Sequence, residues 1–108
     1  MTQETNRGLT VIQQQLKELD QIFQDTMETL NTVSGMERVK SWKARTVTLL
    51  TETVSKEAGQ EFARVQPGPS FTNDLVEEFT DFIDTFKTPL SALLKKLPQA
   101  GPRPSGGG

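Results

Sequence analysis

The side chains of this chain that could do chemistry are carboxylates and hydroxyls, because histidine and cysteine are both absent. Their absence removes the commonest general base, a common metal ligand and all thiol chemistry. A serine nucleophile needs a neighbouring base, and no Ser-x-x-Lys arrangement occurs. No glycine-rich segment is followed by the Lys-Ser/Thr of a phosphate-binding loop. We therefore expect a non-enzymatic protein without a bound cofactor.

Carboxylates cluster between residues 74 and 84, with no base before Lys87. Glu77, Asp81 and Asp84 are spaced i, i+4, i+7, so they share one face of a helix. Divalent cations prefer six or more oxygen ligands supplied by a folded-back loop. We therefore expect no metal site, and we interpret this face as a solvated surface or one that docks a basic partner.

A segment of the opposite charge surrounds the single tryptophan. Its charged residues are Glu37, Arg38, Lys40, Lys43 and Arg45. Because Arg38, Trp42 and Arg45 follow helical spacing, one interpretation is nucleic-acid binding, with Trp42 stacking on bases. The other interpretation makes Trp42 a core anchor and pairs the bases with the acids of residues 73–86. The net charge of −2 provides no wide positive field, so we favour the second interpretation.

In the favoured interpretation these charged residues form a surface that recognises a protein. The alternative function is that of a nucleic-acid-binding regulator. The predicted charged surface comprises Arg38, Lys43, Arg45, Asp81 and Asp84. Its expected role is protein recognition, within one chain or between two.

The element that precedes this surface has a heptad rhythm. Its apolar residues, with one polar member, are Leu9, Ile12, Leu16, Leu19, Phe23, Thr26, Leu30 and Val33. Spacing of alternately three and four residues predicts one long helix over residues 9–33. We expect this stripe to mediate self-association, chiefly through Leu9, Ile12, Leu16, Leu19, Phe23 and Leu30.

Further helical segments are expected after residue 33. Ser34 and Glu37 form a capping-box pattern, which predicts that a second helix begins after a break at Ser34-Gly35 and continues to Val54. Ser55 has the position of an N-cap for a short helix that reaches Val65, and the alternative is a bend in the second helix. Residues 66–70 then form a turn, because two prolines flank a glycine.

The C-terminal part predicts a pair of helices. Thr72 or Asn73 is the expected cap of the first, which carries apolar residues as far as Phe86. Thr88-Pro89 resembles a cap followed by an N1 proline, so a second short helix is expected up to Leu97.

The predicted fold is therefore all-α: a small helical bundle with a long N-terminal helix, a second helix and a C-terminal helix pair. We expect the domain to span residues 1–97 and residues 98–108 to form a flexible Pro/Gly-rich tail or linker. No signal peptide and no apolar run of membrane-spanning length is present. The expectation is a cytoplasmic homo-oligomer, with a protein partner or effector in trans and no membrane partner; nucleic acid is the less favoured partner.

One residue pattern resembles a known type of module. The pattern is Gly35-x-Glu37-Arg38-x-x-x-Trp42-Lys43-x-Arg45-Thr46, followed by Leu49-Leu50 and Val54-Ser55-x-Glu57. It is similar to a helical N-terminal module of uncharacterised bacterial proteins, which precedes variable domains of nucleotide-signalling or phage-defence type. The similarity covers about a third of the chain and brings no catalytic residues with it. It implies an adaptor role, although nothing resembling an effector follows residue 97.

Overall fold

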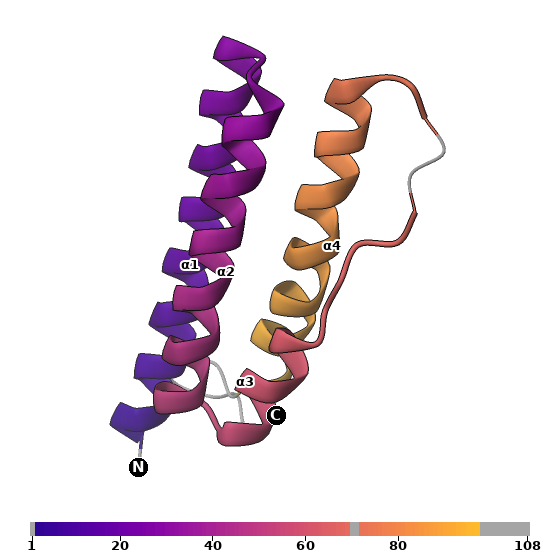
Figure 1. The fold of residues 1–108 in the computed structure, drawn as a ribbon. Helices are drawn as coiled ribbons and strands as arrows, with labels where there is room; N and C mark the ends of the chain where they lie inside the picture. The colour runs from indigo at the N-terminus through magenta and orange to yellow at the C-terminus, as the bar shows by residue number, and fades with distance from the viewer. Residues whose placement is uncertain (1, 70–71, 98–108) are drawn as a thin grey trace.

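The computed structural model describes the backbone of residues 2–69 and 72–97, which form four helices (Figure 1). Helix α1 spans Thr2–Thr29, α2 spans Thr32–Thr53, α3 spans Lys56–Ala63 and α4 spans Leu75–Lys96. The described residues contain no strand, so the prediction of an all-α small helical bundle is confirmed.

Helix α1 ends four residues earlier than the predicted helix. Leu30 has a φ of 57°, and its N–H donates to the carbonyl oxygen of Thr26 at 2.6 Å. This is a left-handed C-cap, a position that glycine or asparagine usually fills. Asn31 then caps α2, because its side chain accepts a hydrogen bond from the N–H of Ser34. The predicted break at Ser34-Gly35 and the Ser34 capping box are therefore wrong.

Gly35 lies inside α2 because three helices meet there. A Cβ at this position would lie 2.5 Å from Oγ1 of Thr26 and 2.9 Å from Cε1 of Phe79. Both distances are shorter than a carbon atom tolerates, so only glycine allows α1, α2 and α4 to approach this closely. The glycine that the sequence presented as a helix breaker is a packing residue.

The short third helix agrees with the sequence. Ser55 caps α3 by accepting a hydrogen bond from the N–H of Ala58 at 3.0 Å. Residues 64–69 are not helical, as the prolines predict.

The predicted C-terminal helix pair is a single helix. Asp74, and neither Thr72 nor Asn73, caps α4 by accepting from the N–H groups of Val76 and Glu77. Pro89 lies within α4 and has no N–H to donate to the preceding turn. Phe86 and Leu90 are buried on either side of the proline, so core packing holds the helix together through that position.

The core lies between α1, α2 and α4, and α3 closes one end of it (Figure 1). Its buried apolar residues are Leu9, Ile12, Leu19, Ile22, Val39, Trp42, Leu50, Phe62, Phe79, Ile83, Phe86 and Leu90. Trp42, Phe62 and Phe86 pack edge to face on one another, with ring centroids 5.8–6.3 Å apart. Each of these three rings comes from a different helix, so the cluster fixes α3 and α4 on α2.

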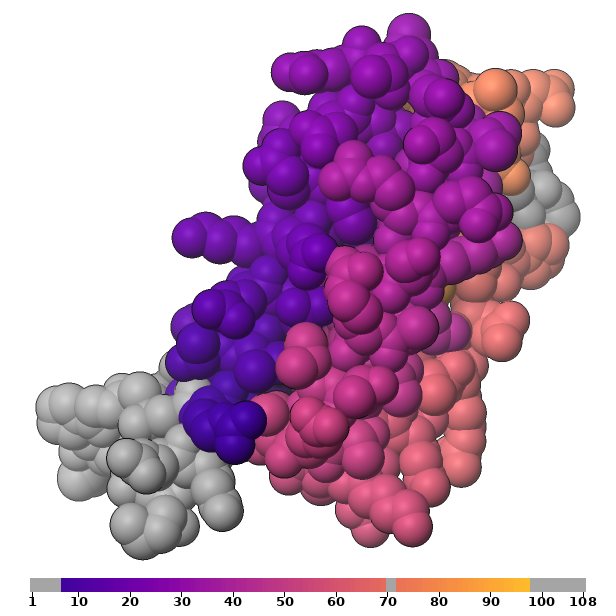
Figure 2. Space-filling view, turned by 60° about the vertical axis from the view of Figure 1, so that its left-hand side comes forward, coloured from indigo at the N-terminus to yellow at the C-terminus, as the bar shows by residue number. Residues whose placement is uncertain are grey.

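Helices α2 and α4 run in the same direction, and α1 runs opposite to both (Figure 1). The register follows from two contacts: Phe23 stacks on Phe79 with ring centroids 6.2 Å apart, and Gly35 lies against Phe79. Leu75, the first residue of α4, lies about one turn before Phe79. The start of α4 therefore lies at the same end of the bundle as the α1–α2 turn. In the space-filling view, purple side chains of that turn project beside the orange first turn of α4 (Figure 2).

Candidate functional site

The predicted self-association stripe on α1 is used mainly inside the chain. Leu9, Ile12 and Leu19 are buried in the core, and Leu16 and Phe23 are half-buried against it. The sixth residue of the predicted stripe, Leu30, is exposed. Five of the six side chains therefore already pack against α2 and α4, and a second copy is not needed to cover them.

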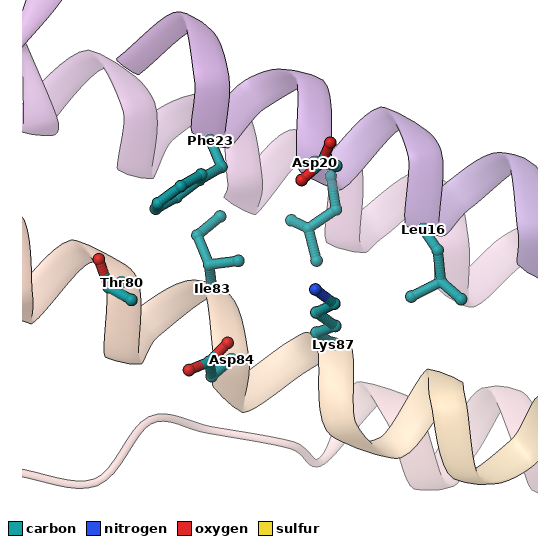
Figure 3. A pocket seen from close by; sticks show the side chains of 8 residues that line it. Leu16, Asp20, Phe23, Thr80, Ile83, Asp84 and Lys87 are labelled. Atoms are coloured by element: carbon teal, nitrogen blue, oxygen red, sulfur yellow. The ribbon is translucent and has the colours of Figure 1, made fainter. Parts of the chain in front are cut away.

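A shallow groove remains where α1 and α4 face each other (Figure 3). It has a volume of about 100 Å³ and is lined by Leu16, Leu19, Asp20, Phe23, Thr80, Ile83, Asp84 and Lys87. Its floor is apolar, and Lys87 extends from α4 towards α1 at its edge (Figure 3). This volume accepts one or two side chains, which is below the usual size of a small-molecule site.

Trp42 is fully buried, as the core-anchor interpretation predicts. Its indole Nε1 donates to the backbone carbonyl oxygen of Gln15 at 2.9 Å. The Gln15 side chain in turn donates to the hydroxyl of Thr46 at 2.7 Å. Because the ring is enclosed, it cannot stack on a nucleic-acid base, and that element of the nucleic-acid interpretation is wrong.

The two arginines beside Trp42 pair with a different helix from the one predicted. Arg38 forms an ion pair of 3.1 Å with Asp25, and Arg45 forms one with Glu18. Both acids belong to α1, so the predicted pairing of Arg38 and Arg45 with the acids of α4 within one chain is wrong. The hydrogen bonds from Gln21 and then Arg38 lower the pKa of the Asp25 carboxyl below its ordinary value.

The other members of the predicted charged surface lie apart from one another. Lys43 is half-buried; its Nζ donates to the carbonyl oxygen of Val65 at 2.7 Å and lies 5.3 Å from the ring centroid of Phe86. Lys43 therefore holds the segment after α3 against α2. Asp84 lies at the α1–α4 groove and Asp81 lies between α2 and α4. The structure does not bring the five predicted residues together as one site.

The feature that the sequence did not predict is an apolar end of the bundle. Among the described residues, the exposed large hydrophobic side chains are Leu30 (64%), Val33 (73%), Leu75 (61%) and Val76 (37%). The first two lie at the α1–α2 turn and the other two in the first turn of α4, so all four lie at one end (Figure 1). We call these four residues the apolar end. The sequence did carry a signal for the turn that exposes Leu30 and Val33, because Asn31 is a typical N-cap residue.

A groove between α2 and α4 continues from the apolar end. It has a volume of about 390 Å³ and is lined by Met36, Lys40, Pro67, Gly68, Pro69, Glu78, Asp81, Phe82 and Thr85. Val33, Met36 and Lys40 share one face of α2, being spaced i, i+3, i+7, and Leu75, Glu78 and Phe82 share one face of α4 in the same way. The half-buried Met36 and Phe82 thus extend the apolar end into this α2–α4 groove.

Among the side chains described in residues 7–69 and 72–97, no three acidic groups come together in an arrangement that could hold a metal ion. No helix in the same ranges has both the length and the apolar character needed to cross a membrane.

Comparisons of the chain with protein-family models, with curated proteins and with solved structures found no match.

Proposed function

We propose that this chain is a non-enzymatic protein–protein interaction domain whose docking surface is the apolar end. The observation that carries the proposal is Leu30, which is 64% exposed and has a φ of 57°. A leucine in the left-handed region costs about 1–2 kcal/mol relative to the right-handed helical conformation. Its exposed side chain recovers little of that cost by burial, so folding alone favours glycine or asparagine at this position. Docking of a partner would account for a leucine there.

The neighbouring side chains support the same proposal. Scattered exposed hydrophobic residues are ordinary, whereas a group of them at one place is typical of an interaction surface. Val33, Leu75 and Val76 share the end of the bundle with Leu30, and the described remainder of the surface has no other large exposed apolar side chain. The resemblance to a bacterial N-terminal module supports an adaptor role in a signalling or defence system.

The test compares the tagged chain with two variants, each expressed in the cells that make the protein. Leu30→Asn combined with Val33→Ser removes apolar surface and suits the left-handed position. Ala44→Gln changes an exposed position on α2 away from the apolar end and serves as the control. We expect co-purified protein, measured by quantitative mass spectrometry, to fall at least about tenfold for the double variant, as a loss of about 1.4 kcal/mol would produce. An unchanged set of partners in the double variant would contradict the proposal.

A further inference from the structure

We infer that the partner segment that binds the apolar end is basic and amphipathic, and that it extends along the α2–α4 groove. This inference rests on the proposed function and adds the chemistry of the partner. Val33 and Leu75 lie at the apolar end, and the half-buried Met36 and Phe82 continue the apolar strip into the groove between the two helices. A strip with apolar residues at helical spacing on both sides suits a helix or extended segment laid lengthwise.

The charge around the groove determines the sign of the partner. The carboxylates in the groove and at the start of α4 are Asp74, Glu77, Glu78 and Asp81. Two of them are engaged locally: Asp74 caps α4, and Glu77 accepts a hydrogen bond from the hydroxyl of Thr72 at 2.7 Å. Lys40 lies 3.7 Å from Glu37, which offsets its charge.

Glu78 and Asp81 are the carboxylates that line the groove itself. Neither forms an ion pair with the side chains described in residues 7–69 and 72–97. Lysine or arginine side chains of a partner would find these two acids beside the apolar strip. The same acids disfavour a second copy of this end as the occupant, because a symmetric contact would place carboxylates opposite carboxylates.

The groove has a volume of about 390 Å³, which falls within the range of ligand pockets. Its lining differs from that of a mostly apolar ligand pocket, because the carboxylates of Glu78 and Asp81 lie beside the half-buried Met36 and Phe82. A mixed lining of this kind is typical of a protein or peptide contact.

The experiment uses a fluorescein-labelled peptide of about 16 residues with leucines at helical spacing and lysines elsewhere. Its control has glutamate in place of every lysine. Fluorescence anisotropy should show that the full chain binds the basic peptide at least about tenfold more tightly than the acidic one, with affinity that falls as salt is added. Amide shifts in NMR spectra should change at residues 33–40 and 75–85.

Two charge-reversal pairs separate a local site from a general attraction. Glu78→Lys with Asp81→Lys reverses the groove, and Glu52→Lys with Glu61→Lys makes the same change of net charge at exposed positions near the other end. We expect the groove pair to weaken binding of the basic peptide about three- to tenfold more than the distant pair does. Thermal melts confirm that each variant is folded.

Three outcomes would overturn the inference: equal binding of both peptides, equal effects of the two reversal pairs, or amide shifts confined to other faces. Each leaves the proposed function standing if the Leu30→Asn/Val33→Ser variant still loses its partners. If that variant keeps its partners, the proposed function fails, whatever the peptides do.

Discussion

Trp42 and Gln15 are joined by a hydrogen bond of 2.9 Å, in which the indole of one helix donates to the main chain of another. The side chain of Gln15 also donates to Thr46, and Thr46 donates to the carbonyl oxygen of Trp42 at 2.8 Å. These polar atoms are buried and partnered, and their geometry holds only at one register of α1 on α2. A satisfied buried network of this kind favours one packing arrangement over its neighbours.

Replacing Trp42 should therefore cost stability in two steps. Trp42→Phe keeps an aromatic ring but loses the hydrogen bond to Gln15 and part of the packing, which we expect to lower the free energy of unfolding by about 2–3 kcal/mol. Trp42→Ala should cost about 3–5 kcal/mol, a large share of the stability of a small domain. Urea denaturation followed by circular dichroism measures both. A wild-type midpoint for Trp42→Ala would contradict the structure.

Gly35→Ala should destabilise the bundle although alanine is the better helix former. The added methyl group would meet Thr26 and Phe79, so α1 or α4 must move away from α2. Overpacking of this kind typically costs about 1–3 kcal/mol, which exceeds the roughly 1 kcal/mol that helix propensity returns. The matched control is Ser34→Ala, at an exposed neighbouring position. A higher melting temperature for Gly35→Ala would show that the three helices do not approach each other as described.

Leu30→Asn should raise stability, the reverse of most substitutions. Asparagine tolerates the left-handed conformation better than leucine, and little buried apolar surface is lost at this exposed position. We expect a gain of about 0.5–1 kcal/mol, which corresponds to a rise of several degrees in melting temperature for a domain of this size. Leu30→Ala is the comparison, because it shortens the side chain without favouring positive φ. Equal melting temperatures for the two variants would count against the cap.

Asp25 should titrate below its ordinary pKa of 3.8, because Gln21 and Arg38 donate hydrogen bonds to its charged form. A lowered pKa in the folded state means that the carboxylate contributes stability above the unfolded pKa and that this contribution is lost as pH falls through the folded value. NMR titration of the Asp25 side chain measures the pKa directly. In Arg38→Gln the pKa should rise towards 3.8. A pKa above 3.8 in the wild-type chain would contradict the Arg38–Asp25 pair.

The sequence predicted the helices where one principle dominated and failed where two competed. Ser55 and residues 66–69 combine local signals that agree, and the structure matches them. At Gly35 and Pro89 local propensity opposed core packing, and packing prevailed because buried neighbours hold the backbone helical.

The sites were less predictable than the fold. Helical spacing placed Arg38 and Arg45 on one face, but spacing within a helix does not say which other helix that face meets. The heptad rhythm of α1 likewise identified side chains that need burial, without showing that α2 and α4 would bury them. The apolar end depends on the turn at Leu30 and on the register of α4 against α2, and both are properties of the assembled bundle.

The central claim is that a partner docks on the apolar end, and photo-cross-linking in the cells that make the protein tests it most directly. A photoreactive amino acid is introduced at Val33, on the apolar end, and in a second chain at Ala44, an exposed position on the same helix. The account predicts a discrete cross-linked protein from position 33, absent from position 44 and lost when Leu30→Asn is added. Cross-links of equal yield and identity from both positions, or none from position 33, would contradict it.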